Sequence, residues 1–252
     1  MNGHPPGTPR LSVNVNKVAT LRNSRGGRIP GVIDAVGVVI GAGSPGITVH
    51  PRADARHITF TDVREIAEEL RPLRERVEYN IEGDPRPDLL DLVKEVRPHQ
   101  CTLVPVRAGE VTSQAGWPPD TPLGEMQATI KGLQHAGVRV SLFVEANSQA
   151  IQWAAAAGAN RIELYTEPYA RAYEHDAASG RQSFERFAEA ARLAHASGLG
   201  VNAGHDLDLQ NLPLFGTLPH LDEVSIGHAL ISHALFVGLD RSVRDYLAAL
   251  AR

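Results

Sequence analysis

The sequence predicts an α/β fold, namely a single (β/α)8 TIM barrel with extra helical or loop insertions. Eight short runs rich in Val and Ile alternate with longer segments of helical periodicity, which is typical of parallel βαβ units. The runs recur about every 20–40 residues, and a chain of 252 residues matches the length of such barrels. An open doubly wound sheet is the competing architecture, but no GxGxxG motif follows the first run, where a dinucleotide fold carries it.

The expected strands are short and contain many β-branched residues. They cover residues 11–16, 46–51, 77–83, 100–105, 139–145, 161–167, 200–205 and 223–228. The expected helices cover residues 33–43, 61–73, 87–98, 121–137, 147–159, 183–198 and 241–252. Thr61 and Ser183 are candidate N-caps, because short polar side chains often open helices. Segments 106–121 and 168–182 read as long polar loops, which in a compact barrel usually serve as lids or binding loops.

Composition and charge limit the classes of partner. The net charge of −4 gives no global attraction for nucleic acid or an anionic membrane, so neither partner is expected. The single cysteine, Cys101, excludes an intrachain disulfide framework and suits a reducing cytoplasm, and we expect it to be a small core residue. No apolar run approaches the roughly 20 residues that a membrane span needs. Residues 1–10 are expected to form a flexible leader, and residues 11–252 one catalytic domain.

Ionisable side chains follow several of the expected strands. In a barrel, chemistry takes place where the carboxyl ends of the strands meet the following loops. Glu82 and Glu163 stand there, and unpaired carboxylates rarely point into an interior without a function. His50, His205 and His228 stand at three further strand ends, and histidine titrates near neutrality. The alternative reading is that each of these residues only caps a loop or pairs with a neighbour.

Two Gly-His pairs, at residues 204–205 and 227–228, indicate sites for oxyanions. Each pair stands at a strand end and before an expected helix, where backbone N–H groups and the helix dipole favour an anion. Arg25 and Arg52 are candidate charged partners for such anions. Arg25 can instead be a solvated loop cation, and Arg52 can instead pair with an acidic neighbour. Asn14, Asn16 and Lys17 add polar groups at the end of the first strand.

The histidines and glutamates also have the donor chemistry of a metal site. The sequence contains no HxH or HExxH motif and no Asp-rich cluster among these residues. We therefore expect no metal.

Eight segments together resemble the pyridoxine 5′-phosphate synthase family, in the same order along residues 11–250. They are VNVNKVATLRNSRG, GITVHPRADARHI, NIEG, LVPVRAGEVTS, VSLFVEA, RIELYTEPYA, VNAGHDL and SIGHALI. The resemblance implies a (β/α)8 barrel that joins 1-deoxy-D-xylulose 5-phosphate with 3-amino-2-oxopropyl phosphate. The implied products are pyridoxine 5′-phosphate, inorganic phosphate and water, made without metal or organic cofactor. The resemblance also implies a homo-octamer built from dimers.

The resemblance assigns roles to individual residues. His50 and Glu82 match the family's proton acceptors, His205 its proton donor, and Glu163 the carboxylate that stabilises the transition state. The residues that match substrate and phosphate contacts are Asn14, Arg25, Arg52, His57, Thr112, Gly227 and His228.

The chain departs from the family pattern at two places. Asn16-Lys17 stands where familiar members have Asp-His, a pair that contacts the ketose phosphate. Asp206 stands where many members have glycine. We expect Asn16, Lys17 and Asp206 to remain in the substrate site, with Lys17 as a hydrogen-bond donor that adds a fixed charge. An ion pair between Lys17 and Asp206 is one way to offset the added carboxylate.

Two other functions stay open from the sequence. A barrel with these phosphate sites can be an isomerase or aldolase acting on a related phosphosugar, which the Asn16-Lys17 substitution motivates. The chain can also be a non-catalytic descendant that acts as a binding or scaffold protein, although its acids and histidines argue against that. Arg22, Arg28 and Trp117 receive no role.

Overall fold

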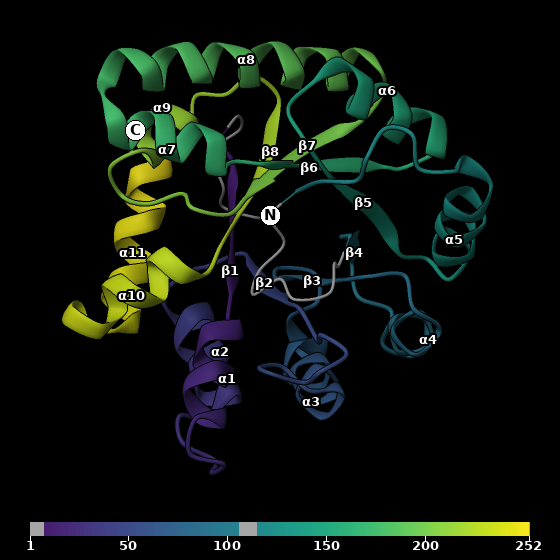
Figure 1. The fold of residues 1–252 in the computed structure, drawn as a ribbon. Helices are drawn as coiled ribbons and strands as arrows, with labels where there is room; N and C mark the ends of the chain where they lie inside the picture. The colour runs from purple at the N-terminus through teal and green to yellow at the C-terminus, as the bar shows by residue number, and fades with distance from the viewer. Residues whose placement is uncertain (1–7, 106–114, 252) are drawn as a thin grey trace.

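The computed structural model describes residues 8–105 and 115–251, and its fold is a closed barrel of eight parallel strands (Figure 1). The strands pair in sequence order, and the last returns to the first, so the (β/α)8 prediction is confirmed and the open sheet is excluded. The strands are β1 (Arg10–Asn14), β2 (Gly46–Val49), β3 (Glu78–Gly83), β4 (Gln100–Leu103), β5 (Arg139–Val144), β6 (Arg161–Tyr165), β7 (Gly200–Gly204) and β8 (Leu221–Ile226).

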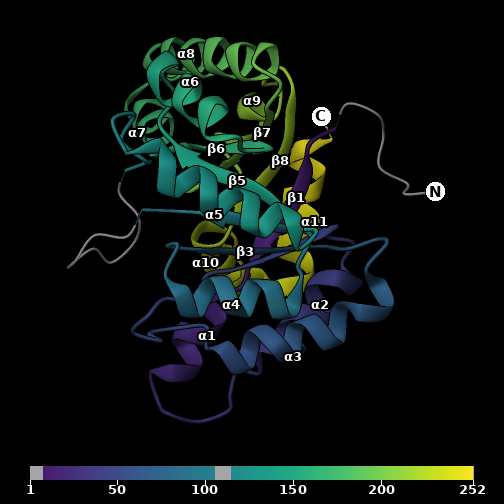
Figure 2. The ribbon, with the colours of Figure 1, turned by 90° about the vertical axis from the view of Figure 1, so that its right-hand side faces the viewer.

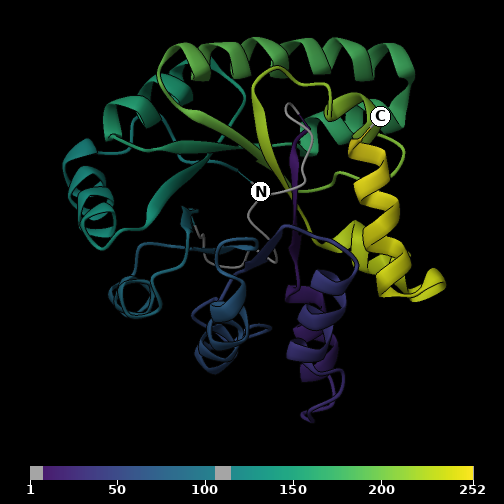
Figure 3. The same cartoon turned by 180° about the vertical axis from the view of Figure 1, so that it is seen from behind.

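Helices form a layer around the strands, as Figures 1 and 3 show from opposite sides. They are α1 (Asn16–Asn23), α2 (Val32–Gly41), α3 (Phe60–Leu70), α4 (Pro87–Val96), α5 (Leu123–His135), α6 (Ser148–Ala157), α7 (Glu167–His175), α8 (Ala177–Ala196), α9 (Leu212–Phe215), α10 (His228–Val237) and α11 (Leu239–Leu250), with a 3-10 turn η1 (Arg71–Leu73). Figure 2 shows α2, α3 and α4 side by side. No described helix is both long and apolar enough to cross a membrane.

Two predicted segments have a different structure. The first strand ends at Asn14 rather than at residue 16, and α1 starts at Asn16. The segment 168–182 is not a loop but contains most of α7 and the start of α8. Pro168 lies in the first turn of α7, where its missing N–H costs no helical hydrogen bond. Asp176 then caps α8 by accepting from two backbone N–H groups.

The predicted N-caps are wrong, by two residues in α3 and by seven in α8. Thr59, not Thr61, caps α3, in a capping box with Asp62. Ser183 is buried inside α8, whose N-cap is Asp176. The expected leader also shortens, because Arg10 already belongs to β1. Residues 1–7 and 106–114 lie outside the described part, and with them most of the expected leader and much of the long loop 106–121.

The apolar core lies between the strands and the helices, whereas the inside of the barrel is polar. Outward residues such as Val13, Ile47 and Ile81 are fully buried against the helices. Many barrels fill their interior with branched apolar side chains. Here side-chain hydrogen bonds cross it instead, including one from Asn202 on β7 to Gln100 on β4 (3.4 Å). The strands therefore position polar groups over their whole length and not only at their ends.

Candidate active site

A cavity of about 410 Å³ lies at the carboxyl ends of the strands. It brings together twelve of the fourteen residues that the sequence assigned to the site. They are Asn14, Asn16, Lys17, His50, Arg52, His57, Glu82, Glu163, His205, Asp206, Gly227 and His228. Arg25 lies on an exposed turn after α1 and does not line this cavity. Thr112 lies outside the described residues.

Two glycines make room for the polar side chains of the cavity. A Cβ at Gly204 would lie 2.3 Å from Oε1 of Glu163, and a Cβ at Gly227 would lie 3.0 Å from Cβ of Asn14. Real side chains do not tolerate the first distance, so glycine on β7 is what allows the Glu163 carboxyl to lie beside that strand.

Glu82 and Glu163 are buried carboxyl groups, 5% and 1% exposed. Burial and, to a smaller extent, the nearby charge of Glu223 raise the pKa of Glu82 to about 8, while a hydrogen bond from Ser225 opposes the shift. Burial and the charge of Glu82 raise the pKa of Glu163 well above its ordinary value. Oε2 of Glu163 has no hydrogen-bond partner among the described residues. Both carboxyl groups therefore hold their protons at neutral pH in the free protein.

The histidines of the cavity show the opposite shift. Burial lowers the pKa of His50 well below 6.5, with further lowering by His57 and Arg52. Burial and the charges of Arg52 and Lys17 lower the pKa of His57 to about 4. Burial also lowers the pKa of His205. The unliganded cavity thus places protonated carboxyl groups beside neutral imidazoles, which gives it groups that can move protons in both directions.

Backbone and ring contacts orient these imidazoles. Nδ1 of His57 accepts the N–H of Ile58 (3.0 Å), so the neutral ring carries its proton on Nε2. The His205 ring packs against Phe143 and Tyr165, with centroids 4.9 and 5.7 Å away. Nε2 of His50 and Nδ1 of His205 are buried and have no hydrogen-bond partner among the described residues. These atoms are available to a substrate.

The side-chain amides of Asn14 and Asn16 connect the end of β1 to Glu82 and His50 through hydrogen bonds. Oδ1 of Asn14 accepts the N–H of Asn16 (3.0 Å), and Nδ2 of Asn14 donates to Oε2 of Glu82 (3.4 Å). Oδ1 of Asn16 accepts the N–H of His50 (2.9 Å). The side-chain carbonyl of Asn16 therefore already holds the segment after β2 against the start of α1, which leaves its NH2 group for a ligand.

Two helix N-termini line the cavity. The first residues of α1 and α10 both contribute to it, and neither helix has an acidic residue in its first turn. The N–H of Asn16 in α1 already binds Oδ1 of Asn14, whereas α10 has no side-chain cap. Free N–H groups and the positive end of the dipole make such termini suited to anions. The Gly204-His205 pair was predicted to open a helix too, and that prediction is wrong, because the next helix, α9, begins only at Leu212.

Asp206 tolerates a backbone conformation that favours glycine. His205 and Asp206 have φ values of 76° and 54°, in the left-handed region. Asp is among the few side chains that adopt this region readily. Asn211 holds the turn by donating Nδ2 to the carbonyl of Asp206 (3.1 Å). The suggested ion pair between Lys17 and Asp206 is not among those formed by the described residues.

Arg22 and Trp117, which the sequence left without a role, are structural anchors. Arg22 donates both terminal nitrogens to the Asp62 carboxylate (2.5 and 2.9 Å), which ties α1 to the first turn of α3. The Trp117 indole N–H donates to the carbonyl of Leu103 (2.9 Å), and its ring packs against Trp153. Arg28 is exposed, and nothing in the structure gives it a role. Cys101 is fully buried, and its thiol pKa is raised to about 12, so it is a core residue.

Several residues of the cavity were missed from the sequence. They are Thr20, Arg56, Tyr165, Leu207, Ser225, Ile226 and Ala229. Strand alternation could have found Tyr165 and Ser225, because each stands two residues from an inward position. Asp54 forms its ion pair with Arg56 (2.5 Å), a partner that the sequence did not suggest.

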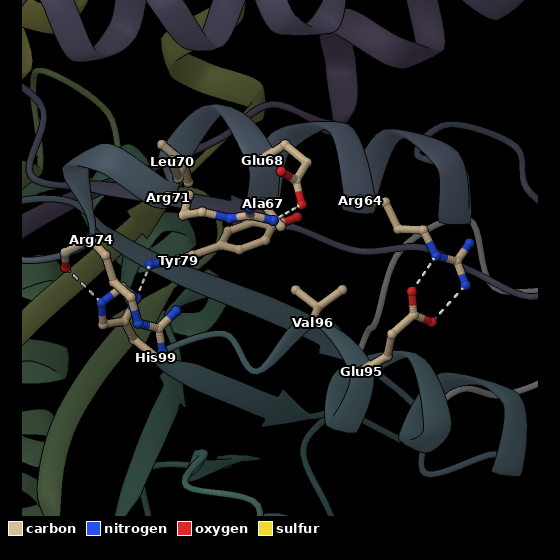
Figure 4. Close-up of a pocket in the computed structure, with 10 residues that line it drawn as sticks. All are labelled: Arg64, Ala67, Glu68, Leu70, Arg71, Arg74, Tyr79, Glu95, Val96 and His99. Carbon is tan, nitrogen blue, oxygen red and sulfur yellow. Dashed lines mark hydrogen bonds and ion pairs between the residues drawn. The ribbon is translucent and has the colours of Figure 1, made fainter.

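A second hollow lies between α3 and α4, and its polar groups pair with one another (Figure 4). Arg64 binds Glu95 (2.7 Å), and Arg71 binds Glu68. The His99 ring uses both nitrogens, one for the N–H of Tyr79 and one beside the carbonyl of Arg74. This hollow is consistent with a structural junction. Within residues 8–105 and 115–251 no three His, Cys, Asp or Glu side chains are grouped to hold a metal ion.

Comparisons with known proteins agree on one family for this chain and on its barrel fold. The family model described as pyridoxal phosphate biosynthesis protein PdxJ matches residues 11–252. Pyridoxine 5′-phosphate synthase of Bacteroides fragilis is 50% identical over 94% of this chain and 97% of its own. The enzyme of the same name from Leptospira biflexa is 46% identical over 96% and 97%. The structure of 3-keto-L-gulonate-6-phosphate decarboxylase from Vibrio cholerae aligns with a TM-score of 0.62 at 12% identity, over 97% and 98%, which supports the fold alone.

Proposed function

The chain belongs to the family of the pyridoxal phosphate biosynthesis protein PdxJ, and on this premise we propose that it is an enzyme that synthesises pyridoxine 5′-phosphate in the cavity of its barrel. The substrates are 1-deoxy-D-xylulose 5-phosphate and 3-amino-2-oxopropyl phosphate, and the products are pyridoxine 5′-phosphate, phosphate and water. One observation carries the proposal: a single cavity combines buried carboxyl groups of raised pKa with buried imidazoles of lowered pKa.

The reaction requires such a mixed set of groups. An amine must condense with a ketone, a phosphate must leave, and the ring must lose water to become aromatic. Each step moves protons at a different atom, so one acid or base cannot serve them all. A carboxyl group with a pKa of about 8 is suited to exchanging protons near neutrality, and this is the property of Glu82.

We assign the proton transfers to four residues. Glu82, once it has ionised, and the neutral His50 accept protons from substrate carbon and nitrogen atoms. His205 gains a proton when dianionic substrates enter beside it, because negative charge favours the imidazolium, and then donates that proton. Glu163 keeps its proton in the buried site and donates a hydrogen bond to an oxygen as negative charge develops on it.

The two phosphate groups need two oxyanion sites. The N-terminus of α10, at Gly227 and His228, is one, since its backbone N–H groups open into the cavity. Arg52 and His57, which lie on the β2 side of the cavity, form the other. Arg25 and Thr112 remain predicted contacts to the second phosphate. Lys17 and the NH2 group of Asn16 take the place of the familiar Asp-His pair and bind the ketose.

We also propose that the chain forms a homo-oligomer in the cytoplasm, as the family resemblance implies. Support comes from large apolar side chains that are exposed in the single chain, namely Phe236 (89%), Ile29 (85%) and Leu235 (71%). We infer that a subunit interface buries the adjacent Leu235 and Phe236, because apolar side chains gain free energy when they leave water. Light scattering of the purified protein measures the assembly, and a monomer at micromolar concentration would refute this part of the proposal.

The activity is tested by supplying both substrates to the purified protein and identifying the product by mass and absorbance. Formation of pyridoxine 5′-phosphate with release of inorganic phosphate is expected. If the protein binds either substrate but forms no pyridoxine 5′-phosphate, the synthase proposal fails, and an isomerase or aldolase acting on a phosphosugar becomes the better candidate. If it binds neither, a scaffold role does.

A further inference from the structure

A third buried glutamate, Glu223, lies inside the barrel just below the cavity. It is 2% exposed and stands on β8 two residues before Ser225, which lines the cavity. Because alternate side chains of a strand point to the same face, the Glu223 side chain points into the barrel, one inward position below Ser225 and the cavity. Oε2 of Glu223 has no hydrogen-bond partner among the described residues, and Oε1 accepts only a long bond from Asn202 (3.4 Å).

Strand register connects Glu223 to the catalytic candidates. Glu163 on β6 is opposite Asn202 on β7, and Asn202 is opposite Glu223 on β8. Asn202 therefore links the strand of Glu163 to the strand of Glu223 inside the barrel. Glu82 on β3 is reached through Ser225, whose hydroxyl bonds the Glu82 carboxyl. A buried carboxyl group with an unpaired oxygen costs folding free energy, so its presence directly below an acid–base site calls for a function.

The charges that face Glu223 come from four strands. Arg10 on β1, Arg139 on β5 and Arg161 on β6 favour its ionised form, although burial opposes it. Glu163 on β6 and Glu82 on β3 repel it. Arg10 is also directly opposite Glu223 in the register of β1 and β8. Of the three carboxyl groups, Glu223 is thus the one whose ionised form is favoured by guanidinium charges.

We propose that Glu223 is a positioning residue for the reaction, acting from below the cavity to keep a proton on Glu82 until substrate arrives. Its negative charge lies in a low-dielectric interior, where it acts on Glu82 without touching the substrate. The inference rests on the proposed function, because it gives Glu223 a part in the proton transfers assigned to Glu82.

The first test measures kcat/KM against pH for the wild type and for Glu223→Gln, which has the same shape without the charge. The acid limb should move about one pH unit lower in Glu223→Gln, because removing a like charge lowers the pKa of Glu82. Glu223→Asp keeps the charge and should keep the wild-type limb. Glu78→Gln removes a different buried carboxylate of the same barrel and should not move the limb. Unchanged limbs in Glu223→Gln, or an equal shift in Glu78→Gln, would overturn the proposal.

The second test needs neither turnover nor a variant that folds. Carbon-13 NMR of the glutamate carboxyl groups in the unliganded wild-type protein should show Glu223 titrating at lower pH than Glu82. The Glu82 signal should show a second inflection at the pKa of Glu223. If Glu223 titrates above Glu82, it carries no charge when Glu82 exchanges protons, and the proposal is wrong. A protein that makes no pyridoxine 5′-phosphate but shows this titration would instead refute only the proposed function.

Discussion

Two glutamates on the same strand of the barrel have opposite surroundings. Glu78, at the start of β3, forms ion pairs with Arg10 (3.2 Å) and Arg139. Glu82, four residues further, is equally buried but contacts the neutral Asn14 and Ser225 and, within residues 8–105 and 115–251, no cation. One end of the barrel interior therefore neutralises its carboxylate, and the other end leaves a carboxyl group that holds a proton. The difference teaches that cation placement, and not burial alone, separates a structural acid from a reactive one.

The largest effect is expected for the reactive end. Glu82→Gln and His50→Ala should each lower kcat by about 10²–10⁴-fold, because each removes a group that transfers a proton. Substrate affinity and the folded state should be retained, which calorimetric binding and circular dichroism can measure. Near-normal turnover in either variant would show that its assigned role is wrong.

The same substitution at the structural end should affect stability instead. Glu78→Gln leaves two guanidinium groups without their carboxylate, and we expect a loss of about 2 kcal/mol in the free energy of unfolding, since these groups are only partly buried. The kcat of the folded fraction should stay close to that of the wild type. A loss of kcat in Glu78→Gln comparable to that in Glu82→Gln would remove the distinction between the two ends.

The pH dependence of stability should also distinguish the two kinds of group. The pKa of Glu82 is about 8 in the folded protein and 4.5 in the unfolded chain, so its stabilising contribution is complete below pH 4.5 and is lost as the pH rises through 8. For His57, with a pKa of about 4 against 6.5, the contribution is complete above pH 6.5 and is lost as the pH falls through 4. Denaturant unfolding at several pH values should show that Glu82→Gln removes the loss of stability between pH 4.5 and 8 and keeps the loss below pH 6.5 that His57 causes.

A smaller effect is expected at the departure from the family pattern. Lys17→Ala should weaken binding of the ketose phosphate by about tenfold, because one charged hydrogen bond is lost. Arg28→Ala is the control, since it removes an exposed cation that does not line the cavity. Isothermal titration with 1-deoxy-D-xylulose 5-phosphate measures both, and an unchanged affinity in Lys17→Ala would exclude Lys17 from the site.

The fold could be predicted from the sequence where the pattern is strong. All eight strands were found, because Val and Ile mark them regardless of their neighbours. α1 was missed because it is only eight residues long and follows directly on the alternation of Val13 and Val15, which extended the predicted strand to residue 16. α7 was missed because Pro168 reads as a breaker unless it is known to lie in a first turn.

The site could be predicted only as a set of strand ends. Glu82, His50 and their companions were found because parallel strands bring their carboxyl ends together. Thr20 and Arg56 come from a helix and a loop whose direction the sequence does not reveal. The raised pKa of Glu82 and its dependence on Glu223 arise from contacts across the barrel, which no local pattern contains.

The rate of pyridoxine 5′-phosphate formation as a function of pH tests the proton-holding role of Glu82 most directly. In the wild type, kcat/KM should rise with pH and level off above about 8, because Glu82 ionises there in the free protein. Glu82→Gln should lack both the activity and this rise. A rate that does not change between about pH 6 and 9, or a Glu82→Gln variant with the wild-type profile, would contradict the assignment of Glu82 as the group that exchanges the proton.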